Sequence, residues 1–225
     1  MLKITEKENK VVSAVIVSAG NSTRMGGINK QFLELDGVSV IVNTITAFQK
    51  SDLVDEIIIV TRECDIEEVA KLVKKYELSK VSNIVSGGET RQLSVYEGVT
   101  STLDVADLVV IHDGARPLVS DRVISETIKS AAEFGAAATG VKVKDTVKVV
   151  DDNDNIIETP DRTFMRFIHT PQVFNKKLYL DAVNSVENSK DFTDDCKLLE
   201  AYGKTVKFVD ADYENIKNTT PEDIE

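Results

Sequence analysis

The segment SAGNSTRMGGINK, which starts at Ser18 and ends at Lys30, has the composition of a phosphate-binding loop. It opens with Ser18, Ala19 and Gly20, whose small size lets the backbone come close to a ligand and point N–H groups at phosphate oxygens. Arg24 and Lys30 add two positive charges. The spacing matches neither G-x-G-x-x-G nor G-x-x-x-x-G-K-[ST], so both common nucleotide loops are disfavoured. We expect a phosphate site of another kind, with an ordinary surface loop as the alternative.

Two further segments combine glycine or charge with a turn. SGGETRQLS, residues 86–94, places paired glycines before a polar helix start, where a flat base could lie against bare backbone; a plain turn is the alternative. IHDGARP, residues 111–117, carries His112, Asp113 and Arg116 at the end of a strand that should be buried. Charges there are costly unless they are paired or ligand-bound. We expect either a ligand site or a structural Asp–Arg pair.

Histidine and cysteine, frequent ligands of transition metals, are few and scattered in this chain. His112 and His169 have no histidine or carboxylate partner at metal-site spacing, so both are expected to be packed, hydrogen-bonded histidines. Cys64 and Cys196 lie far apart without C-x-x-C spacing. We expect two reduced thiols rather than a metal site or a disulfide.

Five shorter segments contain polar residues that are weak signals individually. They are KDTVK at 144–148, DR at 161–162, TPQVF at 170–174, TDD at 193–195 and NIK at 215–217. In the simplest interpretation Lys144 and Lys148 are solvated strand charges and Thr193 is a helix N-cap. Lys217 would then be a surface residue near a helix N-terminus. A cation there opposes the helix dipole, and a bound anion would relieve that repulsion.

Short β-branched runs precede the first three segments and alternate with longer helical periods. Strands are predicted at residues 13–18, 56–61, 81–85, 107–112 and 137–143, and amphipathic helices within residues 40–48, 66–76 and 123–131. Several strands are apolar at successive positions, as in sheets covered on both faces. Right-handed β-α-β connections then give an α/β fold, with a mostly parallel, Rossmann-like sheet and helices on both faces. In such sheets ligands bind at the carboxyl ends of the strands, where these segments lie.

After Lys144 the alternation stops and a β-hairpin is predicted. Its two extended parts are residues 146–150 and 156–160, around a polar turn. A projecting hairpin has little core of its own, so we expect this arm, residues 144–162, to pack against a second subunit in a homodimer. The remaining predicted elements are helices at 176–186 and 194–202, a strand at 205–209 and a helix that starts at Thr220. All of them belong to one predicted domain, residues 1–225.

The charge balance limits the classes of partner. The 225 residues include 38 acidic and 27 basic side chains, for a net charge of -11, which argues against nucleic acid and against anionic membranes. The longest apolar runs have only the length of strands, so no membrane span is predicted. The first ten residues carry charges of both signs without an apolar stretch, so the cytoplasm is the expected location. The net negative charge of the chain still allows a small anionic ligand in a local basic pocket.

Taken in order, these segments resemble the 2-C-methyl-D-erythritol 4-phosphate cytidylyltransferases of the non-mevalonate isoprenoid pathway. The resemblance runs from Val15 to Asp223. The motifs that carry it are SAG at 18–20, RM at 24–25, KQFL at 30–33, GGETR at 87–91, HDGARP at 112–117, VKDTVK at 143–148, TPDR at 159–162, TPQVF at 170–174, TDD at 193–195 and NIK at 215–217. Each motif alone is weak, but their common order is specific.

The resemblance implies a nucleotidyltransferase fold and reaction. A phosphate oxygen of methylerythritol phosphate attacks the α-phosphorus of CTP, and pyrophosphate leaves. Because negative charge accumulates on the α-phosphoryl oxygens, such a reaction depends on positioning and fixed cations. The family's two transition-state cations correspond to Arg24 and Lys30, and the residues that hold the acceptor phosphate correspond to Arg162 and Lys217. Magnesium, held mainly by the triphosphate, is the implied cofactor, with Asp113 as the nearest carboxylate.

The resemblance also implies which residues line the two substrate sites. Those implied around CTP are Ser18, Ala19, Gly20, Gly88, Glu89, Arg91, Ser94 and Asp113. Those implied around the acceptor, besides Arg162 and Lys217, are Arg116, Thr146, Thr170 and Thr193. In the family the hairpin arm crosses to the other subunit, which agrees with the homodimer expected above.

Two other functions are compatible with the same motifs. Ribitol 5-phosphate cytidylyltransferases share the first loop, the His-Asp step and the Asn-Ile-Lys step, but residues 143–148 and 159–162 are more similar to the methylerythritol enzymes. A catalytically silent nucleotide-binding or assembly protein on the same fold is the second alternative. The presence of both Arg24 and Lys30 argues against it.

Overall fold

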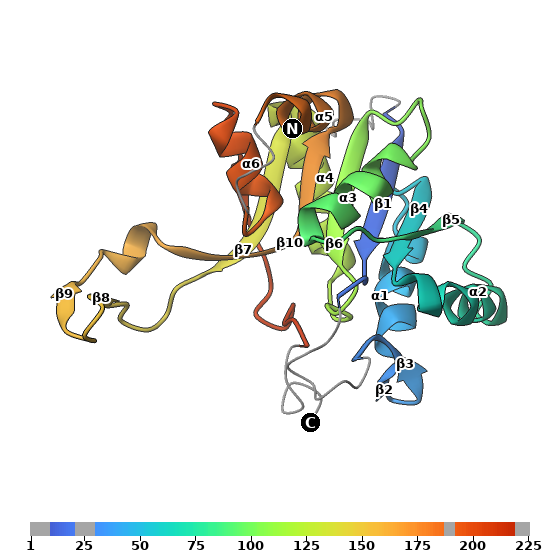
Figure 1. The fold of residues 1–225 in the computed structure, drawn as a ribbon, viewed down its shortest axis with the longest axis horizontal. Helices are drawn as coiled ribbons and strands as arrows, with labels where there is room; N and C mark the ends of the chain where they lie inside the picture. Colours follow the sequence, from blue (N-terminus) through green and yellow to red (C-terminus); the bar gives the residue numbers. More distant parts are fainter. Residues whose placement is uncertain (1–9, 21–29, 187–191, 219–225) are drawn as a thin grey trace, which may run out of the picture.

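A seven-stranded sheet forms the centre of the computed structural model, which describes residues 10–20, 30–186 and 192–218 (Figure 1). In spatial order its strands are β11 (Lys207–Asp210), β7 (Ala136–Lys142), β10 (Arg166–Asn175), β6 (Leu108–Asp113), β1 (Val12–Val17), β4 (Glu56–Thr61) and β5 (Val81–Ser86). Neighbouring strands run parallel, apart from the two pairs that include β10. The predicted α/β fold with a mostly parallel sheet is confirmed.

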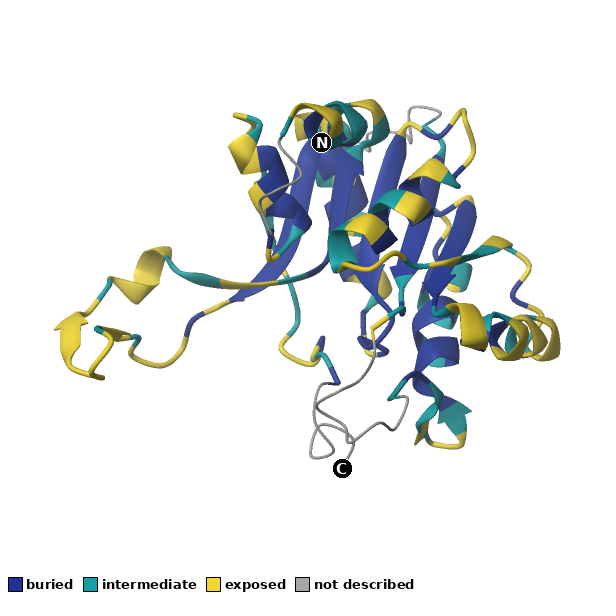
Figure 2. Ribbon diagram, in the orientation of Figure 1, coloured by how far each residue is buried: buried dark blue, intermediate teal, exposed yellow. Residues whose placement is uncertain are grey.

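Helices cover both faces of this sheet and bury two separate cores (Figure 2). The α-helices of the described chain are α1 (Val40–Lys50), α2 (Ile66–Lys75), α3 (Arg91–Thr100), α4 (Asp121–Phe134), α5 (Lys176–Ser185) and α6 (Asp195–Ala201). Ile16 and Ile57 point into the core with α1 and α4, whereas Val15 and Ile58 point into the core with α3, α5 and α6. This alternation is what a strand buried on both faces produces. Among the described residues, no helix has both the length and the apolar character to cross a bilayer.

The strand that sequence reasoning missed is β10, a ten-residue strand inserted antiparallel between β6 and β7. Its sequence, RFIHTPQVFN, mixes polar and apolar residues and contains Pro171. Proline lacks an N–H for the ladder and therefore weakens a strand prediction. The pairing with β7 is irregular between Ile168 and Gln172, which accommodates the proline within the strand. As a result Thr170 belongs to the central sheet rather than to a loop.

The predicted hairpin is present as an arm that projects from the body of the molecule (Figure 1). Its strands, β8 (Val149–Val150) and β9 (Ile156–Glu158), are shorter than predicted. In the structure the arm extends to residue 164, because a 3₁₀ turn, η4 (Arg162–Phe164), ends it and leads back to β10. Ile156, Ile157 and Phe164 on this arm are 62%, 64% and 85% exposed. The arm therefore carries large apolar side chains that the chain itself does not bury.

The remaining elements are small. They are the paired strands β2 (Glu34–Leu35) and β3 (Val38–Ser39) and the 3₁₀ turns η2 (Lys30–Phe32) and η3 (Glu63–Asp65). The five predicted central strands agree with β1, β4, β5, β6 and β7 to within one residue at each end. The helix predicted to start at Thr220 lies outside the described residues.

Candidate active site

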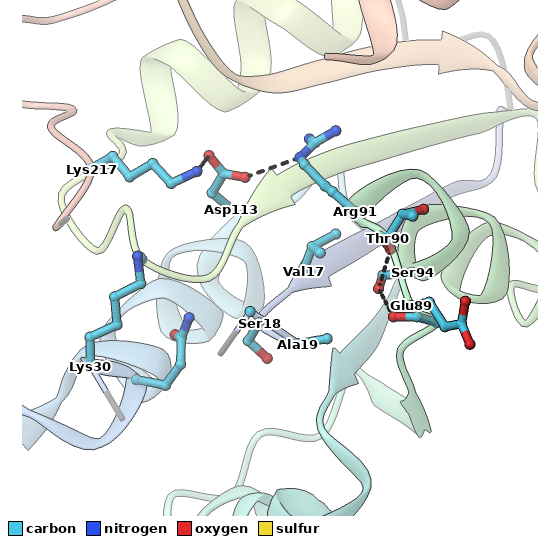
Figure 3. Close-up of a pocket in the computed structure, with 14 residues that line it drawn as sticks. Val17, Ser18, Ala19, Lys30, Glu89, Thr90, Arg91, Ser94, Asp113 and Lys217 are labelled. Carbon is cyan, nitrogen blue, oxygen red and sulfur yellow. Dashed lines mark hydrogen bonds and ion pairs between the residues drawn. The ribbon is translucent and has the colours of Figure 1, made fainter. Parts of the chain in front are cut away.

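The loops that follow β1, β5 and β6 line one cavity of about 380 Å³ at the carboxyl edge of the sheet (Figure 3). It contains predicted residues from all three loops and from the C-terminal segment, namely Ser18, Ala19, Gly20, Lys30, Gly88, Glu89, Arg91, Ser94, Asp113 and Lys217. Val17, Gln31, Thr90 and Ala115 complete its lining. The cavity thus combines bare loop backbone with side chains of both charges.

Close packing fixes the loop after β1 against the paired glycines. The Ser18 hydroxyl donates a hydrogen bond of 2.8 Å to the Val60 carbonyl, which anchors the start of the loop to β4. A Cβ at Gly87 would lie 2.4 Å from the Cβ of Ala19. Only glycine allows this approach, so Gly87 is required for packing against Ala19. The role of the paired glycines in holding a flat base stays a prediction. Arg24 lies in residues 21–29, outside the described part of the chain.

Helix α3 begins at the cavity, and its first turn is held by its own side chains. The Thr90 hydroxyl caps the helix by accepting from the Leu93 N–H at 3.1 Å. The Ser94 hydroxyl donates to the carbonyls of Thr90 at 2.9 Å and of Gly88 at 3.3 Å. These bonds hold the loop over residues 88–90 against the helix and bring Ser94 and Glu89 to the cavity wall.

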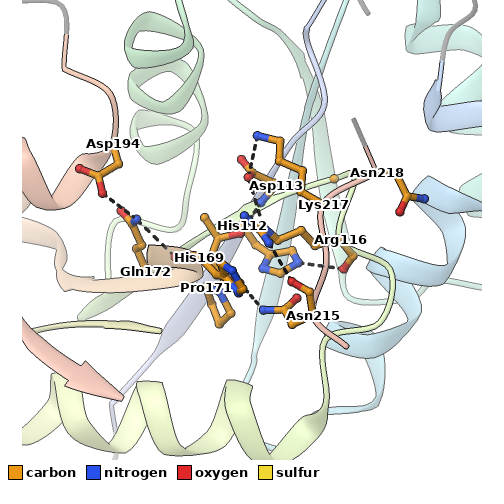
Figure 4. A network of polar contacts seen from close by, with 12 residues as sticks. His112, Asp113, Arg116, His169, Pro171, Gln172, Asp194, Asn215, Lys217 and Asn218 are labelled. Carbon is orange, nitrogen blue, oxygen red and sulfur yellow. Dashed lines mark hydrogen bonds and ion pairs between the residues drawn. The ribbon is translucent and has the colours of Figure 1, made fainter. Parts of the chain in front are cut away.

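Asp113, the last residue of β6, is surrounded by three cations. Its carboxylate lies 2.9 Å from Lys217 Nζ, 3.4 Å from Arg116 Nε and 3.8 Å from Arg91 Nε (Figures 3 and 4). Burial alone would raise the pKa of Asp113, but the charges of Lys217, Arg91 and Arg116 outweigh burial and hold that pKa well below its usual range. The predicted Asp–Arg pair is therefore one part of a larger cluster, in which Asp113 is ionised and Lys217 is oriented toward the cavity.

Arg91 links this cluster to two buried residues that sequence reasoning did not select. Its Nη1 lies 2.7 Å from the carboxylate of Asp195, which also accepts a 2.9 Å hydrogen bond from the Tyr179 hydroxyl. Asp195 and Tyr179 are 3% and 0% exposed. Burial alone would lower the pKa of Arg91. The charges of Asp195 and Asp113 outweigh burial and raise that pKa above its usual value, so the guanidinium stays charged. The signal for Asp195 was present in the TDD motif, where only Thr193 was selected.

A second cavity, of about 410 Å³, adjoins the first, and Lys217 lines both. It is lined by Arg116, Val141, Lys142, Lys144, Asp145, Phe167, His169, Tyr213, Ile216 and Lys217. Lys144 Nζ lies 3.4 Å from the centre of the Tyr213 ring, and the Tyr213 hydroxyl donates to the Lys142 carbonyl at 2.8 Å. Four cations and one carboxylate give this cavity a positive balance that suits an anionic ligand.

The other predicted site residues of the described chain line neither of these two cavities. Thr170 is buried, and its hydroxyl accepts from the Asp113 N–H at 3.0 Å, directly beneath the charged cluster. Thr146 and Arg162 lie on the arm and line neither cavity; the Arg162 guanidinium donates to the Lys144 carbonyl. Thr193 is exposed and also lines neither cavity. The N-cap of α6 is Asp194, so the interpretation of Thr193 as the cap is wrong.

His112 is packed and hydrogen-bonded as predicted. It is fully buried in β6, with its Nε2 3.2 Å from the Arg116 carbonyl and its ring 4.8 Å from the Phe48 ring (Figure 4). His169 lines the second cavity, and its Nδ1 has no hydrogen-bond partner among the described residues. Burial lowers the pKa of both histidines to about 4. Within the described residues, no group of three or more histidine, cysteine or acidic side chains could hold a metal ion.

We expect both histidines, the only two in the chain, to titrate near pH 4 rather than near the usual value of 6.5. Between these pH values the unfolded chain binds protons that the folded chain does not, so stability should fall as the pH is lowered through this window. Proton NMR of the two imidazole rings, with His169→Gln to assign them, measures the midpoints directly. A midpoint near 6.5 for either ring would contradict the environment described above.

Comparison with known proteins supports one family along nearly the whole chain. The family model for 2-C-methyl-D-erythritol 4-phosphate cytidylyltransferase matches residues 12–225. The enzyme of that name from Caldanaerobacter subterraneus subsp. tengcongensis is 46% identical over 216 residues, which is 95% of each chain. The one from Alkaliphilus oremlandii is 43% identical over 216 residues, 94% of this chain and 91% of the relative.

A solved structure extends the similarity to three dimensions. The crystal structure of 4-diphosphocytidyl-2C-methyl-D-erythritol synthase from Anaerococcus prevotii superimposes with a TM-score of 0.86 at 35% identity, covering 96% of this chain and 93% of that one. The fold thus agrees with sequence matches that span nearly the full length of each relative. The chain belongs to the 2-C-methyl-D-erythritol 4-phosphate cytidylyltransferase family.

Proposed function

We propose that the protein transfers the cytidylyl group of CTP to 2-C-methyl-D-erythritol 4-phosphate. A phosphate oxygen of the acceptor attacks the α-phosphorus, the bond from that phosphorus to the bridging oxygen of the β-phosphate breaks, and pyrophosphate leaves. The product is 4-diphosphocytidyl-2-C-methyl-D-erythritol, a precursor in non-mevalonate isoprenoid biosynthesis. The observation that carries the proposal is the pair of adjoining cavities that share Lys217, because two phosphorylated substrates must meet at one phosphorus.

The first cavity is the proposed CTP site. The bare backbone of Ser18, Ala19 and Gly20 suits the triphosphate, and Gly88 and Ser94 line the part of the wall proposed for the pyrimidine. Gly88, Glu89 and Ser94 are proposed to read cytosine, and Arg91 and Asp113 to line the site around the nucleotide. Arg24 and Lys30 are proposed to stabilise the charge that accumulates on the α-phosphoryl oxygens. For Arg24 the support is the sequence motif alone.

The second cavity is the proposed site of the acceptor phosphate. Arg116 and Lys217 supply positive charge there, and Thr170 lies beneath Asp113. Thr146 and Arg162 on the arm, and Thr193, are proposed to complete the site; the first two do so in a homodimer, when the arm of a second copy reaches this cavity. The exposed apolar side chains of the arm support such a partner surface. The cytoplasmic location expected from the sequence stays a prediction.

Nucleotidyltransferases commonly use a divalent cation, and we propose Mg²⁺ bound mainly to the triphosphate of CTP. The described residues do not form a metal site by themselves. Asp113, the carboxylate considered for this role, already contacts Lys217, Arg116 and Arg91. Because these three cations already neutralise the carboxylate, Asp113 does not fit the role of a metal ligand. We therefore propose no catalytic step on an ion bound by the protein.

Turnover with two acceptors tests the proposed substrate. Pyrophosphate release is measured with CTP and either methylerythritol phosphate or ribitol 5-phosphate. We expect a kcat/KM at least ~10-fold higher for the first, since residues 143–148 and 159–162 are more similar to the methylerythritol enzymes. Preference for ribitol 5-phosphate would replace the acceptor but keep the chemistry. Absence of pyrophosphate release with both alcohols would overturn the proposed reaction.

A further inference from the structure

The segment from Asn215 to Asn218 is irregular, yet its first and last residues are buried. It follows β11 without forming a helix or strand, and its two asparagines are 0% and 1% exposed. Irregular backbone at such depth must satisfy its polar groups through contacts with other elements. The Asn215 carbonyl accepts from Arg116 Nη1 at 2.8 Å, and the Asn218 N–H donates to the Ala115 carbonyl at 2.9 Å. The segment is thus attached to the loop after β6.

This one segment also contacts both lysines of the proposed reaction. Lys217 belongs to it, and its Nζ reaches Asp113 at 2.9 Å. Lys30, from the other side of the first cavity, donates from Nζ to the Asn218 carbonyl at 3.0 Å. A shift of the segment would therefore move Lys217 and also the carbonyl that holds Lys30 Nζ, whereas the backbone of Lys30 belongs to η2. The spacing of the two cations thus depends on how firmly the segment is held.

The side chain of Asn215 attaches the segment to a second element, in addition to the loop after β6. Its Nδ2 donates a 2.9 Å hydrogen bond to the Thr170 carbonyl in β10, far away in sequence (Figure 4). The hydroxyl of Thr170 in turn accepts from the Asp113 N–H at 3.0 Å. Asn215 thus ties the segment to the central sheet at the residue next to the charged cluster. Asn218 differs, because its Nδ2 has no hydrogen-bond partner among the described residues.

We propose that Asn215 is a positioning residue that sets the spacing of Lys30 and Lys217 by fastening their common segment to Thr170. The role of the two lysines in turnover rests on the proposed function. Their placement does not, because it can be measured without any substrate. Asn218 offers a matched control, since it is an equally buried asparagine in the same segment whose side-chain amide nitrogen makes no such bond.

The first experiment compares wild type, Asn215→Ala and Asn218→Ala by limited acetylation of lysine amines, read by mass spectrometry. Loss of the tie should let the segment open locally, so Lys30 and Lys217 should react ~3-fold or more faster in Asn215→Ala. Lys80, whose Nζ bonds the Ser51 carbonyl at the opposite end of the sheet, should react at the wild-type rate in all three. Unchanged rates at both lysines in Asn215→Ala, or equal increases in Asn218→Ala, would overturn the proposal.

Turnover gives a second readout that separates positioning from simple loss of folding. Asn215→Ala should lower kcat and raise the KM for the acceptor, each by ~10-fold, with little change in the KM for CTP. In the double variant with Lys217→Ala, the loss of turnover should be smaller than the product of the two single losses, because both substitutions act through Lys217. Full additivity would contradict that coupling. If Asn215→Ala is poorly folded, Asn215→Ser keeps a hydrogen-bond donor and should give smaller changes of the same kind.

The two hypotheses fail in different ways. If wild type releases no pyrophosphate with either alcohol, the proposed function fails, while the acetylation rates still decide whether Asn215 places the lysines. If wild type is active and Asn215→Ala shows wild-type acetylation and kinetics, the positioning role fails and the function stands.

Discussion

Replacing Lys30 with alanine is expected to lower kcat by ~10²-fold or more and to change the KM for CTP much less. Lys30 lines the proposed CTP cavity, and its Nζ is held at the Asn218 carbonyl beside Lys217. A cation at this point interacts most strongly when negative charge grows on the α-phosphoryl oxygens, which happens in the transition state rather than in the bound substrate. The substitution should therefore lower kcat rather than raise the KM for CTP. Steady-state pyrophosphate release and a separate CTP titration measure the two quantities.

Lys80→Ala is the matched control for this experiment. Lys80 also donates from a partly buried Nζ to a backbone carbonyl, that of Ser51, but it precedes β5 and so lies at the edge of the sheet opposite the cavity. Its removal should leave kcat within about 2-fold of wild type, because it can affect only local stability. Equal turnover in Lys30→Ala would remove the catalytic role of this lysine. A wild type without turnover is a separate outcome, which would favour the alternative of a nucleotide-binding protein without activity.

The central strands were predictable because their environment is uniform. β4 and β6 are buried along their full lengths, and each contains a run of four apolar residues, 57–60 and 108–111, so the sequence signal of each strand is continuous at its centre. β10 lacks that continuity. Part of it pairs in the sheet centre and part leads toward the arm, and its burial changes from intermediate to exposed to buried along ten residues. A periodicity search averages over such a change and therefore misses the strand.

The candidate site was predictable where it lies next to a strand in the sequence. Ser18 and Asp113 follow or end predicted strands, and parallel topology brings the carboxyl ends of those strands together. Asp195 and Asn215 could not be selected in this way. Each acts through a partner distant in the chain, Arg91 in one case and the Thr170 carbonyl in the other. Both residues stand in motifs recognised in the sequence, TDD and NIK, but their partners depend on tertiary packing and cannot be identified from local sequence.

Arg162 is a predicted site residue that does not line either cavity of its own subunit. It lies in η4 on the projecting arm, and neither cavity of its own chain includes it (Figure 1). The arm beside it exposes Ile156 and Phe164, which is unfavourable in water and favours a protein surface as partner. If that partner is a second copy and its acceptor cavity receives the arm, as proposed above, two-fold symmetry makes the exchange of Arg162 reciprocal. Each site would then need Lys30 from one chain and Arg162 from the other.

Mixing two inactive variants is therefore expected to restore activity. Lys30→Ala and Arg162→Ala should each be nearly inactive alone. In a mixed dimer, one site receives both substitutions and the other receives neither, so random exchange of subunits should restore about a quarter of wild-type activity. The activity is measured after dissociation and reassociation of equal amounts of the two proteins. Lys30→Ala mixed with Lys217→Ala is the control, since both of these residues line the cavity of one chain and every mixed site keeps one defect. No restoration in the test pair would place Arg162 within its own subunit or outside the reaction, and the arm would then serve assembly alone. Restoration in the control would instead contradict the placement of Lys30 and Lys217 in one site of one chain.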